Sequence, residues 1–208
     1  MSRYIEAKCK LCRRERMKLF LKGDRCNTNK CAIERNLQTP GEPAKKIRKK
    51  LSGYAIQLRE KQKVKRMYGI HEQQFRKYYE NAASTKGVTG EILLQFLERR
   101  LDNVIFRAGF APSRSSARQL VNHGHIMVNK HRVNIPSYIV RENDLVEVQE
   151  KSKNLDMITQ TLAKNGGKTR EWIVLDLPKM TATVKQLPQR VDIDADINEQ
   201  LIIELYSK

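Results

Sequence analysis

All four cysteines of this 208-residue chain lie within its first 31 residues, and this clustering strongly constrains how the N-terminal segment can fold. Cys9 and Cys12 form a C-x2-C pair, and Cys26 and Cys31 form a C-x4-C pair 13 residues later. Two thiolates with so short a spacing can point at one ion, and a second pair completes a tetrahedron. The pattern predicts a zinc knuckle, in which one structural Zn2+ ion is held by all four thiolates.

Other uses of the four cysteines are less favoured. The chain begins without an apolar stretch after its first basic residue, so no secretory signal is expected, and disulfides are typical of secreted proteins. A set of four cysteines without histidine leaves no water-open position, which argues against catalytic zinc. An iron–sulfur cluster also takes four thiolates, and this alternative stays open.

The positive charge is concentrated in the first 90 residues. The formal net charge is +18, and residues 1–90 hold 24 Lys and Arg against 8 Asp and Glu. Nucleic acid is the usual anionic partner of such an excess. A membrane is disfavoured because the basic stretches are nearly free of apolar residues. The candidate phosphate-binding residues here are Lys45, Lys46, Arg48, Lys49, Lys50, Arg59, Lys61, Lys63, Lys65 and Arg66.

The apolar content is high enough for a folded protein. Leu, Ile, Val and Phe number 52 of 208 residues, above the roughly 20% below which charged chains stay disordered. No apolar run approaches the ~18 residues of a transmembrane helix. We therefore expect a soluble, strongly basic protein of the cytoplasm.

Hydrophobic periodicity predicts an α+β fold. Helices are expected over residues 54–68, 71–83, 89–108, 113–122, 155–164 and 197–206. Strands are expected over residues 125–129, 132–135, 144–148, 171–176 and 181–184, and residues 32–53 are expected to be extended or irregular. Helices on both sides of a strand-bearing middle indicate an inserted domain.

A second basic segment, residues 99–141, carries eight Arg and Lys against one acid, Asp102. Arg114 and Arg118 are spaced i,i+4 on one predicted helix, and Ser113 is its expected N-cap. Such a fork of guanidinium groups beside a helix N-terminus suits phosphates. The alternative is a solvated face of a core helix. The candidate RNA-binding residues of this segment include Arg99, Arg100, Arg107, Arg114 and Arg118.

The segments 98–104, 109–114 and 117–126 resemble the RNA-binding module that is named after small-subunit ribosomal protein number four. Residues 57–63, 67–69 and the ending 199–208 extend the resemblance to the bacterial ribosomal protein family itself, over essentially the whole chain. The cysteine segment resembles the zinc-binding version of this family.

This resemblance implies a primary binder of 16S-type small-subunit rRNA that nucleates assembly of the subunit body. It implies neighbouring ribosomal proteins as partners, chiefly protein number five, with an influence on translational accuracy, and possible contact with messenger RNA (mRNA). It implies three parts: residues 1–45, a helical domain of residues 46–90 with 188–208, and an inserted domain of residues 91–187, whose RNA-binding module spans about 98–160. The RNA-facing residues carried over from the family are Ser113, Arg114, Ser115, Arg118, Gln119, His123, Lys130 and His131.

Lys130 departs from the family pattern, because relatives usually have glycine there. The turn that contains it is therefore expected to be of another type, or to place Asn129 in the left-handed region.

An enzyme is the competing class of function, and the sequence disfavours it. Gly166-Gly167-Lys168-Thr169 resembles the end of a phosphate-binding loop, but position 162 is leucine and the order would be helix, loop, strand. An appended catalytic domain of roughly 150 residues has no room in this chain. The remaining alternative is a stand-alone RNA-binding or stress protein with the same module.

Overall fold

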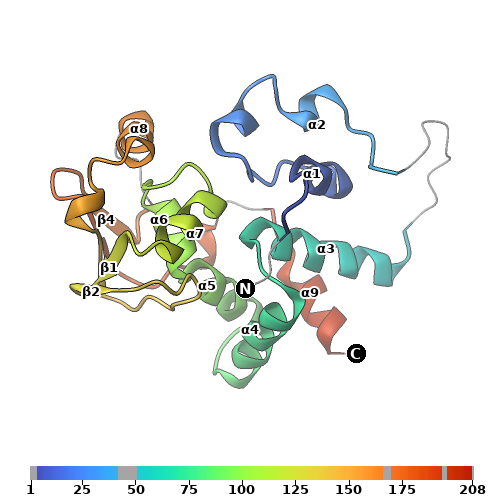
Figure 1. Cartoon of the computed structure of the whole chain (residues 1–208). Helices are drawn as coiled ribbons and strands as arrows, with labels where there is room; N and C mark the ends of the chain where they lie inside the picture. The colour runs from blue at the N-terminus through green and yellow to red at the C-terminus, as the bar shows by residue number, and fades with distance from the viewer. Residues whose placement is uncertain (1–3, 42–50, 166–169, 194–195, 208) are drawn as a thin grey trace. The chain divides into compact units, whose positions relative to one another are not determined.

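The computed structural model describes residues 4–41, 51–165, 170–193 and 196–207. The chain divides into two compact units, residues 1–90 with 196–208, and residues 91–195 (Figure 1). The division of the sequence into three parts stays a prediction. Five candidate phosphate-binding residues and the glycine-lysine segment lie outside the described residues: Lys45, Lys46, Arg48, Lys49, Lys50 and 166–169.

The N-terminal segment contains three short helical elements. They are α1 (Cys9–Glu15), the 3-10 helix η1 (Gly23–Asn27) and α2 (Ala32–Arg35). The expectation that residues 32–53 are irregular is therefore wrong at its start, where α2 forms directly after Cys31. Among the described residues 4–41, the buried apolar side chains are Cys12, Leu19, Cys26 and Cys31.

Three longer helices build the rest of the first unit: α3 (Gly53–Tyr68), α4 (Glu72–Ser84) and α9 (Glu199–Tyr206). They confirm three of the predicted helices. Ser52 caps α3 by accepting from the Ala55 N–H, and Gly69 ends it in the left-handed conformation at φ 65°. Helix α9 packs along α3 (Figure 1). The Tyr206 ring of α9 stacks on Tyr79 at 4.7 Å between centroids.

The second unit is a small sheet with helices. Strands β1 (Ile126–Val128), β2 (His131–Arg132), β3 (Leu145–Val148), β4 (Ile173–Asp176) and β5 (Thr181–Val184) form one antiparallel sheet in the order β2-β1-β3-β5-β4. Helices α6 (Leu101–Arg107), α7 (Arg114–Asn122) and α8 (Asp156–Asn165) contribute to its core, with the two shorter 3-10 helices η2 (Glu150–Ser152) and η3 (Arg190–Asp192) in the connections. The α+β expectation with a small antiparallel sheet is confirmed.

The apolar core of the second unit is extensive. It includes Val104, Phe110, Ile126, Val146 and the single tryptophan, Trp172, which is 1% exposed. Alternation along the strands directs one face of the sheet into this core, as Val146 and Val148 on β3 show. The fold of this unit therefore rests mainly on buried apolar area.

The predicted helix over 89–108 is wrong in one respect, because it is two helices. Helix α5 (Thr89–Glu98) begins at the end of the first unit, and α6 starts after a break at Arg99 and Arg100. Arg100 has extended backbone and forms an isolated antiparallel bridge with Ile139. The Leu101 N–H then donates to the Tyr138 carbonyl at 2.8 Å instead of to a helical partner. Long-range pairing overrides the helical periodicity here.

The hairpin between β1 and β2 turns on two residues. Asn129 and Lys130 have φ values of 50° and 67°, as a type I′ turn requires. The expectation that Asn129 lies in the left-handed region is confirmed, and Lys130 lies there as well. Of the predicted strand over 132–135, Arg132 is in β2.

Candidate nucleic-acid interface and cysteine site

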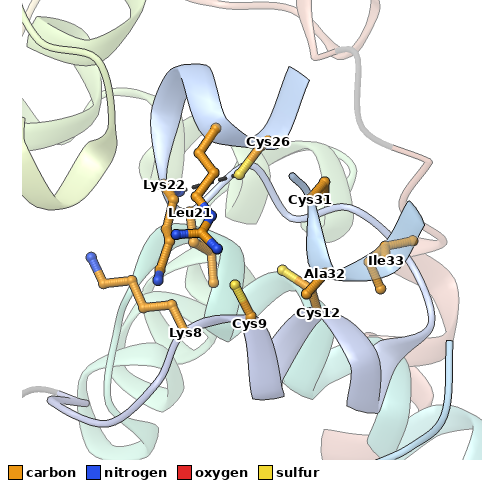
Figure 2. A pocket seen from close by; sticks show the side chains of 10 residues that line it. Lys8, Cys9, Cys12, Leu21, Lys22, Cys26, Cys31, Ala32 and Ile33 are labelled. Atoms are coloured by element: carbon orange, nitrogen blue, oxygen red, sulfur yellow. Dashed lines mark hydrogen bonds between the residues drawn. The ribbon is translucent and has the colours of Figure 1, made fainter. Parts of the chain in front are cut away.

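The four cysteines of the N-terminal segment line one pocket (Figure 2). Cys9 and Cys12 come from α1, Cys26 from η1, and Cys31 directly precedes α2. Two backbone N–H groups donate to the sulfurs, that of Leu19 to Cys12 and that of Lys22 to Cys26 Sγ at 3.4 Å. The loop between the cysteine pairs therefore donates hydrogen bonds to one cysteine of each pair, Cys12 and Cys26.

The electrostatics of the pocket disfavour an uncompensated thiolate at Cys12. Burial raises the pKa of Cys12, the hydrogen bond from Leu19 opposes this, and the charges of Cys26, Cys9 and Cys31 raise it further. Soft thiolates with backbone N–H donors are the ligand chemistry that suits Zn2+. Among the described residues, no three or more side chains of His, Cys, Asp or Glu are placed so that together they could hold a metal ion. The zinc ion therefore stays a prediction.

The basic face of α3, expected to meet RNA, has carboxylate partners inside the first unit. Lys61 and Lys65 bind Glu72 at 2.5 and 3.0 Å. Lys63 binds Glu60 at 2.6 Å. Arg59 and Arg66 both bind Glu15, whose side chain is 3% exposed at the end of α1. Burial raises the pKa of Glu15 although both arginines oppose this. The pairs with Glu15 and Glu72 hold α3 to α1 and α4, whereas the Lys63–Glu60 pair lies within α3.

Arg100 is a correction to the predicted RNA-binding set. The residue is 0% exposed, and its guanidinium binds Asp102 in a bidentate pair, with Nε to Oδ1 at 3.0 Å and Nη2 to Oδ2 at 2.7 Å. Arg118, 9% exposed, approaches the same carboxylate at 3.5 Å. A fully buried arginine with this partner cannot present its charge to a phosphate at the surface, so Arg100 serves the fold.

Glu98 organises a second network in the same unit. Its carboxylate, in a residue that is 1% exposed, accepts from Arg107 Nε at 2.9 Å and Nη2 at 2.7 Å, and from Asn103 Nδ2 at 2.7 Å. Asn103 in turn accepts from Arg114 Nε at 2.7 Å. The Arg114 guanidinium also lies 4.7 Å from the Phe106 ring centroid, a cation–π distance. Arg114 is thus held in one orientation at the start of α7.

The serines at the start of α7 are bound to each other. Ser113 Oγ caps the helix by accepting from the Ser116 N–H, and it lies 3.0 Å from Ser115 Oγ.

Arg99, another residue of the predicted set, donates through Nε to the Val140 carbonyl at 3.0 Å. Burial, followed by the charge of Arg141, lowers the pKa of Arg99. Arg99 and Ser115 are partly exposed and Ser113 is buried, and all three have these internal contacts.

The exposed members of the predicted set lie on α7 and on the hairpin. Gln119, His123, Lys130 and His131 are all exposed. Arg132 of β2 donates to the His123 carbonyl at 3.3 Å, which brings the end of α7 next to the hairpin. We refer to these four residues as the module surface. In the rest of the carried-over set, Arg114 and Ser115 are partly exposed, whereas Ser113 and Arg118 are buried.

Two of the acidic partners, Glu15 and Glu98, could not be found from local sequence patterns. Glu15 pairs with residues 44 and 51 positions away, and no local spacing signals such contacts. Glu98 lies one residue outside the basic segment 99–141, and its pairing with Arg107, nine positions on, crosses the break between α5 and α6. A wider sequence window includes Glu98 but still gives no signal for Glu15.

Comparison with known proteins fits this arrangement. The family profile described as "Ribosomal protein S4/S9 N-terminal domain" matches residues 3–98, and the one described as "S4 domain" matches residues 99–146. "Small ribosomal subunit protein uS4A" of Alkaliphilus oremlandii is 56% identical over 209 residues, with all of both chains covered. The chain belongs to the uS4 family. "Small ribosomal subunit protein uS4" of Anaeromyxobacter dehalogenans (56%) and of Thermus thermophilus (53%) also match over the full length of both chains.

Membership of the uS4 family confirms that the chain is a structural and not a catalytic protein. The helices in the described part of the chain are all too short or too polar to cross a membrane. The zinc-binding version of the family, and the individual RNA contacts, stay predictions.

Proposed function

We propose that this protein is a structural constituent of the small ribosomal subunit that binds 16S-type rRNA directly and nucleates assembly of the subunit body. The observation that carries the proposal is the identity of 53–56% over the full chain to proteins named small ribosomal subunit protein uS4. The match of residues 99–146 to the S4 domain supports RNA binding by the second unit.

The physical basis of this function is phosphate neutralisation combined with shape recognition. A net charge of +18 releases counterions when it meets RNA, with a log–log salt slope of about −0.7 to −0.9 per phosphate contact. Duplex RNA hides its major groove, so folded junctions are recognised mainly by shape. Rigidly held groups such as Arg114 serve this purpose, because a fixed guanidinium selects a fixed phosphate position.

The test compares affinity for transcribed small-subunit rRNA with affinity for an unrelated structured RNA of equal length, at ~0.3 M salt to suppress non-specific binding. We expect a preference of at least a hundredfold, or about 2.8 kcal/mol. Equal affinity for both RNAs would contradict the proposal and would favour a stand-alone RNA-binding protein.

We further propose that Cys9, Cys12, Cys26 and Cys31 hold one structural Zn2+ ion. The shared pocket and the N–H donors to Cys12 and Cys26 support this. Metal analysis of the purified chain should give one zinc per chain and no iron. Iron with inorganic sulfide would indicate a cluster instead, and absence of both would contradict a metal site.

The partners follow from ribosome membership. We propose neighbouring ribosomal proteins, chiefly protein number five, and mRNA as further contacts, with the ribosome of the cytoplasm as the location. The three-part division at about residues 45, 90 and 188 is proposed together with them.

A further inference from the structure

Phe20 is an exposed aromatic residue with an unfavourable backbone conformation. It is 47% exposed and has a φ of 51°, in the left-handed region. Bulky side chains are outliers there, whereas glycine adopts it freely. Neither the conformation nor the exposure of the ring stabilises the isolated chain.

The residues on both sides of Phe20 explain why its side chain is directed outward. Leu19 is 0% exposed, and its N–H donates to Cys12. Leu21 lines the cysteine pocket, and the next residue, Lys22, donates its N–H to Cys26 Sγ (Figure 2). Because both neighbours are anchored at the cysteine site, the turn displays the ring between them. A strained residue that its surroundings hold in place is typical of binding sites.

The surroundings of Phe20 in the chain are strongly basic. Residues 16–25 contain Arg16, Lys18, Lys22 and Arg25 against one acid, Asp24. Arg16, Lys22 and Arg25 are exposed, while Lys18 is partly exposed and binds Glu34. An apolar protein pocket would not require this charge. An unpaired nucleobase would, because its own phosphates flank it.

We propose that Phe20 is a stacking platform for one unpaired nucleobase of the bound RNA, with the surrounding basic side chains contacting the adjacent phosphates. Aromatic rings stack on splayed single-stranded bases in this way in many RNA-binding proteins. The inference rests on the proposed RNA-binding function and adds a base contact in the cysteine segment, outside the module surface.

The test measures the affinity of full-length variants for transcribed small-subunit rRNA. Phe20→Ala should weaken binding by about 5- to 150-fold, the effect of losing one aromatic stack. The salt slope should stay unchanged, because no phosphate contact is lost. Phe20→Tyr should bind like the parent, since it keeps the aromatic face.

Two further variants distinguish aromatic stacking from a purely apolar contact and from unfolding. Phe20→Leu keeps apolar volume without a π face and should bind as weakly as Phe20→Ala. Phe20→Gly removes the backbone strain, so it should be at least as stable to heat as the parent and still bind weakly. Weak binding by a well-folded glycine variant excludes unfolding as the cause.

The inference is overturned if Phe20→Ala binds the rRNA like the parent, which would leave the ring to a protein neighbour, or if Phe20→Leu restores affinity. Neither result would contradict the proposed function. That function is contradicted only if the parent chain shows no preference for small-subunit rRNA over the unrelated RNA.

Discussion

The N-terminal cysteine segment (residues 4–41) and the second unit both display basic side chains, but they are held together differently. The second unit buries twenty apolar residues in one cluster. The described residues of the cysteine segment bury Cys12, Leu19, Cys26 and Cys31, three of which are predicted metal ligands. Burial of apolar area contributes about 25 cal/mol per Å2, so the four buried side chains of the cysteine segment are too few to order it alone. The second unit is therefore self-supporting, and we expect the cysteine segment to depend on its thiols.

The largest effect is expected from a variant that removes two of the thiols on which the cysteine segment is expected to depend. In the double variant Cys9→Ala, Cys12→Ala, residues 4–41 should lose their protection from amide hydrogen exchange, and affinity for rRNA should fall, because structural zinc contributes most of the folding free energy of such knuckles. Trp172 is the single tryptophan and is buried in the second unit, so its fluorescence should remain native. The matched control is Ile5→Ala, at a site 85% exposed in the same segment. Global unfolding, or unchanged affinity, would refute the comparison.

The second prediction tests the other region. Asp102→Ala leaves the fully buried Arg100 without its bidentate partner and should destabilise the second unit by about 3–5 kcal/mol. Urea unfolding followed by Trp172 fluorescence measures this loss. Within the same unit, Glu150→Ala removes a surface i,i+3 pair with Lys153, in which the Glu150 side chain is 84% exposed, and it should cost about 0.5 kcal/mol or less. If the two variants unfold alike, Asp102 is not a structural centre of this unit.

How much of the fold could be predicted from the sequence depends on whether each feature is determined by neighbouring or by distant residues. The helix predicted over residues 54–68 is confirmed as Gly53–Tyr68, because its periodicity and its stop, Gly69, are local signals, whereas its cap Ser52 lies in the segment expected to be irregular. The break before Leu101 was missed because its cause is non-local, the bridge between Arg100 and Ile139. The four cysteines and the many basic residues are visible in the sequence as candidate ligands for a metal ion and for phosphates. It could not assign the basic residues to interior or surface, because that depends on distant carboxylates such as Glu15.

The third prediction concerns the pH dependence of the first unit. Partial burial alone would raise the pKa of Glu72, but hydrogen bonds from Lys61, Tyr206 and Lys65 outweigh it and lower the pKa to about 2. A lowered pKa stabilises the fold above the ordinary pKa of 4.5, and this stabilisation is lost as the pH falls from there towards 2. Glu72→Gln should therefore cost about 1–2 kcal/mol at pH 7, reduced by solvent screening because the side chain is 42% exposed.

Urea unfolding of the first unit, followed by the near-ultraviolet circular dichroism of its tyrosines, measures this effect. The difference between parent and Glu72→Gln should shrink between pH 4.5 and 2. Glu80→Gln is the control, because its exposed pair with Arg76 should give a small difference at every pH. A constant difference for Glu72→Gln would mean that the hydrogen bonds, and not the charge, hold α4 to α3 and α9.

The smallest expected effect separates stability from binding on the module surface. Lys130 has a φ of 67° at the tip of the hairpin, where glycine is unstrained. Lys130→Gly should therefore stabilise the second unit by about 1 kcal/mol. It should also weaken rRNA binding and reduce the magnitude of the salt slope by about 0.7–0.9, the value for one phosphate contact. An unchanged slope would show that Lys130 is strained for a reason other than RNA.

Asn129→Gly is the reciprocal change in the same turn. Asn129 Oδ1 accepts from the Leu145 N–H at 2.9 Å, and its Nδ2 donates to Asp144 at 2.8 Å, so its side chain anchors the hairpin to β3. Its removal should destabilise the second unit by about 1 kcal/mol but leave the salt slope of the folded protein unchanged. We expect Lys130→Gly to stabilise and Asn129→Gly to destabilise the second unit, and only Lys130→Gly to change the salt slope. This result would show that the two adjacent left-handed residues have different roles. Asn129 would then fix the turn, and Lys130 would keep a strained conformation in order to present its charge.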